Sequence, residues 1–214
     1  MPQTIHLYVF DTLADWEHGY AVAGLNKPAM QRQPGRFVVR TVAESKAPIV
    51  TMGGVRIQPD LTLDQIRPND SALLLLPGGD AWDEGRNLAV LELARTWVSA
   101  NVPVAAICGG TAGLAKAGLL DTRRHTSNAP IYLDATGYAG GPYYEETRAV
   151  TSEDGLVITA GSMWPLEFAY EIFRRLGVYD AEVLAAWFGL FSTGEPQHFA
   201  KLMELAGEAA TPGT

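Results

Sequence analysis

The sequence predicts an α/β fold built on an open, mostly parallel sheet with helices on both faces. Residues 72–76 and 102–107 are continuous apolar runs, as expected for strands that are covered on both sides. Residues 88–98, which lie between these runs, carry apolar side chains at helical spacing. This alternation of strand and helix is typical of a parallel sheet.

The predicted elements follow one another in short segments along the chain. Strands are expected at residues 5–10, 36–42, 72–76, 102–107, 124–128, 147–151 and 155–160. Helices are expected at residues 16–25, 61–66, 88–98, 112–120, 164–176, 181–190 and 196–205. A Gly-Gly pair between two β-rich segments predicts a hairpin at residues 49–57, and residues 136–142 predict a loop.

Length and charge limit the kind of protein. A chain of 214 residues that is 47% hydrophobic fits one domain, which we expect at residues 1–208, with a loose tail at 209–214. A net charge of -8 without any large cluster of lysine or arginine argues against nucleic-acid and membrane partners. Because no secretion signal and no membrane-length apolar segment are found, we expect a cytoplasmic protein.

Cys108, the only cysteine, stands between the apolar run 102–107 and a glycine-rich segment that opens the next helix. A strand-to-helix elbow of this kind exposes a nucleophile. The free N–H groups of the first helical turn favour an anion, so we expect this thiol to ionise more easily than an ordinary one. The alternative is a buried structural cysteine, because free cysteines are often buried.

Three segments are expected at the carboxyl edge of the sheet, where ligands collect in open α/β folds. They are residues 11–17, 77–80 and 108–110. The backbone N–H groups of Gly79 and Gly109 are candidates for an oxyanion hole, with Gly110 and Thr111 beside them as substrate-binding candidates. The alternative for the glycines is a role in the turns alone.

Few residues are candidates for a catalytic acid or base. Glu17 lies about one turn into the first predicted helix and can point back at the elbow, with Asp11 and Asp15 as alternatives. His125 is the candidate base, since it follows the elbow helix. No metal site and no cofactor site are expected, because neither zinc-ligand spacing nor a phosphate-binding glycine motif is present.

The chain resembles the ThiJ/PfpI superfamily, which has the class I glutamine amidotransferase-like, flavodoxin-type fold. The likeness extends from about residue 4 to residue 177 and rests on four segments: residues 8–17, 74–79, 105–120 and 155–160. It implies a reactive thiol at Cys108 and a hydrogen-bonded carboxyl at Glu17. It also implies that the Gly79 and Gly109 amides face the thiol, and that the protein is a homodimer.

Two departures from the family pattern bear on activity. Family peptidases place a histidine directly after the cysteine, whereas this chain has Gly109. The amidotransferase triad uses a late His-x-Glu, which the residues after His198 do not supply. We therefore expect neither peptidase nor glutaminase activity, and His125 and Asn128 are the possible substitutes near the thiol.

Three functions remain open. The first is a cofactor-independent enzyme in which Cys108 attacks a small electrophilic, carbonyl-type metabolite. The second is a stress-response redox sensor that works through oxidation of Cys108. The third is an amidotransferase-like protein without catalytic activity. Stoichiometric oxidation without turnover would indicate the sensor, and turnover that requires Cys108 would indicate the enzyme.

Overall fold

The computed structural model describes the backbone of residues 2–210 and the side chains as far as residue 207. Seven strands form one sheet in the order β5-β2-β1-β6-β7-β9-β8, and every neighbouring pair is parallel except β8 and β9. The strands are β1 (Gln3–Tyr8), β2 (Phe37–Ala43), β5 (Leu61–Thr62), β6 (Ser71–Leu76), β7 (Val104–Ile107), β8 (Ala149–Thr151) and β9 (Val157–Ala160). The short strands β3 (Ile49–Val50) and β4 (Arg56–Ile57) form a separate antiparallel hairpin.

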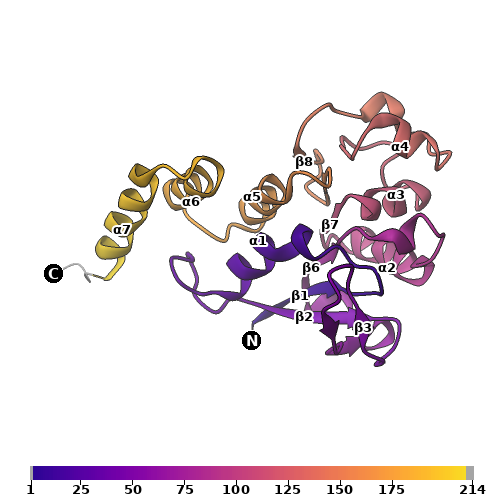
Figure 1. Cartoon of the computed structure of the whole chain (residues 1–214), viewed down its shortest axis with the longest axis horizontal. Coiled ribbons are helices and arrows are strands. Elements are labelled where there is room, and N and C mark those ends of the chain that lie inside the picture. The colour runs from indigo at the N-terminus through magenta and orange to yellow at the C-terminus, as the bar shows by residue number, and fades with distance from the viewer. Residues whose placement is uncertain (1, 211–214) are drawn as a thin grey trace.

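Helices cover the sheet and extend beyond it (Figure 1). They are α1 (Asp15–Asn26), α2 (Leu88–Ser99), α3 (Gly109–Lys116), α4 (Pro130–Asp134), α5 (Pro165–Leu176), α6 (Ala181–Thr193) and α7 (Pro196–Ala210). Helix α1 packs against α5, and α2 packs against α3. Helices α6 and α7 lie beyond α5, away from the sheet.

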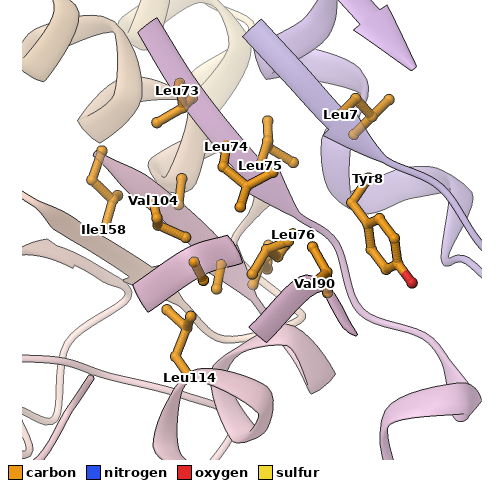
Figure 2. Close-up of a cluster of buried hydrophobic side chains, with 14 of the residues drawn as sticks. Leu7, Tyr8, Leu73, Leu74, Leu75, Leu76, Val90, Val104, Leu114 and Ile158 are labelled. Carbon is orange, nitrogen blue, oxygen red and sulfur yellow. The ribbon is translucent and has the colours of Figure 1, made fainter. Parts of the chain in front are cut away.

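The core lies around the central strands β6 and β7 (Figure 2). Leu73, Leu74, Leu75 and Leu76 have no exposed surface, and neither does any residue of β7. Successive residues of a strand face opposite sides, so both faces of the sheet are covered at its centre. This burial holds the end of β7, and therefore the residue that follows it, in a fixed position.

Most predicted elements are confirmed, and the seven-stranded sheet has the predicted class. Residues 124–128 are an exception: they form no strand, and only an isolated bridge joins His125 to Tyr144. Residues 61–66 contain the short strand β5 and a 3-10 helix (Leu63–Gln65) instead of an α-helix. Helix α4 was not predicted, since its five residues are too few to show a helical period.

The C-terminal end of the chain and the lengths of the helices bear on the remaining expectations. Helix α7 continues through Ala210, so it occupies the first two residues of the predicted tail, and residues 211–214 lie outside the described residues. In the part of the chain that is described, no helix combines the length and the apolar character needed to cross a membrane.

Candidate active site at the β7–α3 elbow

Cys108 is the hinge between β7 and α3. Its φ of 56° and ψ of -124° place it in a region that side chains larger than glycine rarely adopt. Its N–H donates to the Ala160 carbonyl oxygen at 3.1 Å, which ties the bend to the end of β9. The side chain is partly exposed. The strained backbone at Cys108 thus projects its thiol from the edge of the sheet.

Glu17 meets this thiol from the first turn of α1. Its side chain is only 1% exposed, and its Oε2 accepts a hydrogen bond of 2.5 Å from the Gly78 N–H. The Cys108 thiol donates a second hydrogen bond to the same carboxylate. Burial raises the pKa of Glu17 to about 7, because a charged carboxylate loses its hydration there. Glu17 therefore keeps its proton to a higher pH than an ordinary glutamate.

The sulfur has two further polar neighbours. The Asn128 Nδ2 donates to it at 3.5 Å, and the Gly109 N–H also hydrogen-bonds it. Burial and the nearby Glu17 charge nevertheless raise the pKa of Cys108 to about 11. The expectation that this thiol ionises more easily than an ordinary one is therefore wrong: the free amides of α3 do not outweigh desolvation and the neighbouring carboxylate.

Gly78 is the residue that allows the thiol and the carboxyl to meet. A Cβ atom at this position would lie 2.6 Å from the Cys108 Cβ and 2.7 Å from the Glu17 Oε2. Both distances are well below ordinary contact, so any side chain here would separate the pair. The sequence singled out Gly79, the next residue, but a Cβ atom there would meet Thr12 and Phe10 instead.

The other elbow residues support the bend. A Cβ atom at Gly110 would lie 2.4 Å from the Leu76 carbonyl oxygen, so glycine is needed for α3 to approach β6 this closely. Thr111 has no exposed surface. Its hydroxyl lies 2.5 Å from the Cys108 carbonyl oxygen and 2.6 Å from the Ser127 hydroxyl. Thr111 therefore holds the elbow and offers no surface for the expected contact with substrate.

His125 is placed differently from the sequence expectation. It has no exposed surface; its Nδ1 donates to the Arg123 carbonyl oxygen at 2.7 Å, and its Nε2 accepts from the Tyr138 hydroxyl at 3.1 Å. Burial lowers its pKa, which keeps the ring neutral. Both ring nitrogens are thus occupied away from the sulfur. The physical reason is local: residues 124–128 form no strand that would carry the ring to the sheet edge.

The two aspartates that were alternatives to Glu17 hold the β3–β4 hairpin. Asp11 accepts a hydrogen bond from the Val50 N–H at 2.8 Å. Asp15 accepts from the Thr51 hydroxyl at 2.6 Å and from the Gly53 N–H at 2.7 Å. Both carboxylates are therefore engaged outside the thiol site, which leaves Glu17 as the acid at the elbow.

One residue near the pair gave no signal in the sequence. Tyr132, on α4, donates a hydrogen bond of 2.8 Å to Asp83. Its pKa is raised by burial, by Asp83 and by the negative charges of Cys108 and Glu17, which places its hydroxyl within electrostatic range of both. In the described residues, no three His, Cys, Asp or Glu side chains converge as ligands for a metal ion.

Comparisons with known proteins place this site in a family. Residues 3–175 match the family model described as DJ-1/PfpI. The chain is 38% identical over 202 residues to the "Uncharacterized protease YoaZ" of Bacillus subtilis, covering 93% of this chain and 95% of the relative. It is 30% identical over 157 residues to "Protein/nucleic acid deglycase 2" of Escherichia coli, covering 72% and 84%.

A solved structure agrees with the fold over nearly the whole chain. The thiJ/pfpI family protein from Bacillus anthracis superposes with a TM-score of 0.87 at 39% sequence identity, covering 95% of this chain and 98% of that one. The range matched by the family model, residues 3–175, includes both Glu17 and Cys108.

Proposed function

Because this chain belongs to the DJ-1/PfpI family, we propose that it is a cofactor-independent enzyme in which Cys108 adds to the electrophilic carbon of a small carbonyl compound. The observation that carries the proposal is the close approach of the Cys108 thiol and the buried Glu17 carboxylate, which both lie against Gly78. Relatives named as proteases and deglycases make catalysis a reasonable expectation for this chain, without fixing its type.

The thiol proton passes to Glu17 as the sulfur attacks. As the sulfur lone pair forms a bond to the carbonyl carbon, the C=O π electrons move onto oxygen, which then takes the proton from Glu17. The product of this step is a hemithioacetal. The Gly109 N–H and the Asn128 Nδ2, which contact the sulfur, stabilise the negative charge that develops on it as the proton leaves.

A stable thiolate is not needed for this chemistry. Although the pKa of Cys108 is raised to about 11, the pKa of Glu17 is about 7, so Glu17 accepts the proton at the moment of attack. Peroxide oxidation of Cys108 needs the same loss of the thiol proton, so turnover decides between the enzyme and the redox sensor. Peptidase activity has less support, because the candidate histidine, His125, is occupied by Arg123 and Tyr138.

The test is turnover of an α-oxoaldehyde such as methylglyoxal, measured as the disappearance of that compound. We expect Cys108→Ser to lower kcat/KM by about 10³-fold or more, since removal of a catalytic nucleophile has effects of that order or larger. Thermal melting of both proteins provides the control for folding. Turnover by the parent that persists in Cys108→Ser would contradict the proposal, as would a parent protein that is oxidised stoichiometrically by peroxide but turns over no carbonyl compound.

A further inference from the structure

Tyr132 and Asp83 form a polar pair that the proposed mechanism does not use. The Tyr132 hydroxyl donates a hydrogen bond to the Asp83 carboxylate at 2.8 Å. A phenol has one proton to donate, and here the carboxylate holds it. The Tyr132 oxygen can therefore only accept a hydrogen bond from any other group, and a carboxylate is likewise an acceptor. The pair thus presents acceptors and a negative charge.

Tyr132 reaches the elbow from α4. This helix packs against α3 (Figure 1) and begins two residues after Asn128, whose Nδ2 contacts the sulfur. Burial and Asp83 raise the pKa of Tyr132, and the negative charges of Cys108 and Glu17 raise it further. The hydroxyl therefore lies within electrostatic range of the thiol and of the carboxyl that takes its proton.

Trp82 holds Asp83 beside the same elbow. Trp82 is 2% exposed, and its Nε1 donates to the Pro77 carbonyl oxygen at 2.9 Å. A Cβ atom at Gly109 would lie 2.8 Å from the Trp82 ring, so this ring packs directly against the start of α3. Asp83, the next residue, is exposed and forms no ion pair with any residue that the structure describes.

The charges that act on this side of the elbow are negative. As far as the chain is described, no lysine, arginine or histidine is among the groups that shift the pKa of Cys108, Glu17 or Tyr132. Lys116 contacts the Trp82 carbonyl oxygen at 3.5 Å, but it stands in the last turn of α3, at the other end of that helix from Cys108. A group that binds between the sulfur and Tyr132 therefore meets hydrogen-bond acceptors and negative charge.

We propose that Tyr132 and Asp83 set the substrate class of the elbow: a small carbonyl compound that carries a hydrogen-bond donor, such as a hydroxyl, and no carboxylate. The inference rests on the proposed function, since Cys108 must hold the carbonyl carbon for the donor to lie near Tyr132. A hydroxyl of the substrate donates to the Tyr132 oxygen or to Asp83. A carboxylate would lose hydration beside like charges and find no donor there.

Turnover of three aldehydes tests this substrate class. Hydroxypyruvaldehyde is methylglyoxal with one added hydroxyl, and glyoxylate carries a carboxylate in place of the acetyl group. We expect kcat/KM for hydroxypyruvaldehyde to be about fivefold higher than for methylglyoxal, the effect of one hydrogen bond. For glyoxylate we expect it to be lower by about tenfold or more, because of charge repulsion.

Variants of the pair assign these preferences to its two members. Tyr132→Phe removes the acceptor, so it should abolish the preference for the hydroxyl. Asp83→Asn keeps an acceptor for Tyr132 but removes the charge, so it should raise kcat/KM for glyoxylate relative to methylglyoxal by about fivefold. Asp180→Asn, which removes the same charge from an exposed residue that pairs with Arg32, should change neither ratio. Ratios measured within one variant do not depend on the fraction that is folded.

Alkylation of Cys108 measures the selectivity without turnover. Iodoacetamide carries a carboxamide where iodoacetate carries a carboxylate. With either reagent the sulfur bonds to the CH2 carbon, iodide leaves and the thiol loses its proton. We expect the ratio of the iodoacetamide rate to the iodoacetate rate at Cys108 to exceed the ratio for mercaptoethanol by about fivefold or more, and Asp83→Asn to lower it by about threefold.

The outcomes distinguish this inference from the function on which it rests. Turnover with the same substrate ratios in the parent, Tyr132→Phe and Asp83→Asn would overturn the inference and leave the carbonyl-adding enzyme in place. Equal changes in Asp83→Asn and Asp180→Asn would also overturn it, since net charge would then explain the selectivity. Selective alkylation without turnover of any aldehyde would contradict the proposed function, whereas recognition of a donor by Tyr132 and Asp83 would stand.

Discussion

Two buried titratable groups near the sheet edge, Glu17 and His125, have opposite fates. Glu17 is 1% exposed and His125 is fully buried, so burial alone does not distinguish them. Glu17 hydrogen-bonds the partly exposed thiol, so a proton can move between the carboxyl and the sulfur. His125 is held by the Arg123 carbonyl and the Tyr138 hydroxyl, so neither nitrogen is free.

The difference shows that a buried ionisable residue becomes chemically useful through its partner. Burial shifts both groups toward their neutral forms. In the Glu17–Cys108 pair this shift raises the pKa of the carboxyl to about 7. In the His125 cluster it keeps the imidazole neutral in a closed hydrogen-bond network.

The largest effect is expected from Glu17→Gln in the carbonyl assay. Loss of a general base should lower kcat/KM by about 10²- to 10⁴-fold. In the parent, the base form of Glu17 predominates above its pKa of about 7, so kcat/KM should rise with pH through about 7 and then level off. The glutamine variant should lose this rise. A parent profile that is flat between pH 5 and pH 8 would separate Glu17 from the reaction.

A smaller effect, on stability, tests the same pKa without any substrate. The pKa of Glu17 is raised from 4.5 to about 7 by folding, so the native state binds more protons than the unfolded state between these values. Stability from this group is full below pH 4.5 and is lost as pH rises toward 7. The loss amounts to at most about 3 kcal/mol.

Urea unfolding at several pH values measures this linkage. We expect the free energy of unfolding of Glu17→Gln to improve relative to the parent as pH rises from 4.5 to 8. Glu146→Gln, which changes an exposed glutamate, serves as the control and should follow the parent curve. If the Glu17 and Glu146 variants behave alike, the buried carboxyl titrates as an ordinary one, and the exchange of protons at the elbow loses its basis.

The sequence was sufficient for the sheet and for the elbow, because both are encoded locally. Continuous apolar runs specify covered strands, and Cys108 follows one of them directly. Which neighbour meets the thiol depends on longer-range geometry. The Pro-Gly-Gly segment after β6 indicated a close approach, but only the folded chain shows that Gly78, one residue before the predicted Gly79, stands against the pair.

The local sequence could not predict the pKa of the thiol or the position of His125, for a related reason. The free amides at the start of α3 predict a lower pKa for Cys108, but desolvation and the Glu17 charge together raise it. Their balance depends on burial, which the residues around Cys108 do not specify. Likewise, residues 124–128 carry a β-rich pattern but form only an isolated bridge, and the direction of the His125 ring follows from contacts with Tyr138 and Tyr144.

The smallest effect on catalysis is expected at His125. In His125→Asn the amide can still donate to the Arg123 carbonyl, but the hydrogen bond with Tyr138 is lost, so the free energy of unfolding should fall by about 1–3 kcal/mol. Because neither nitrogen of the parent ring contacts the thiol, kcat/KM should stay within about threefold of the parent. Tyr138→Phe removes the same hydrogen bond from its other end and should likewise destabilise the protein without a change in the pH profile. The contrary result is that His125→Asn lowers kcat/KM by about tenfold or more while Tyr138→Phe leaves the pH profile unchanged. That result would show that His125 takes part in the reaction, as Glu17 does.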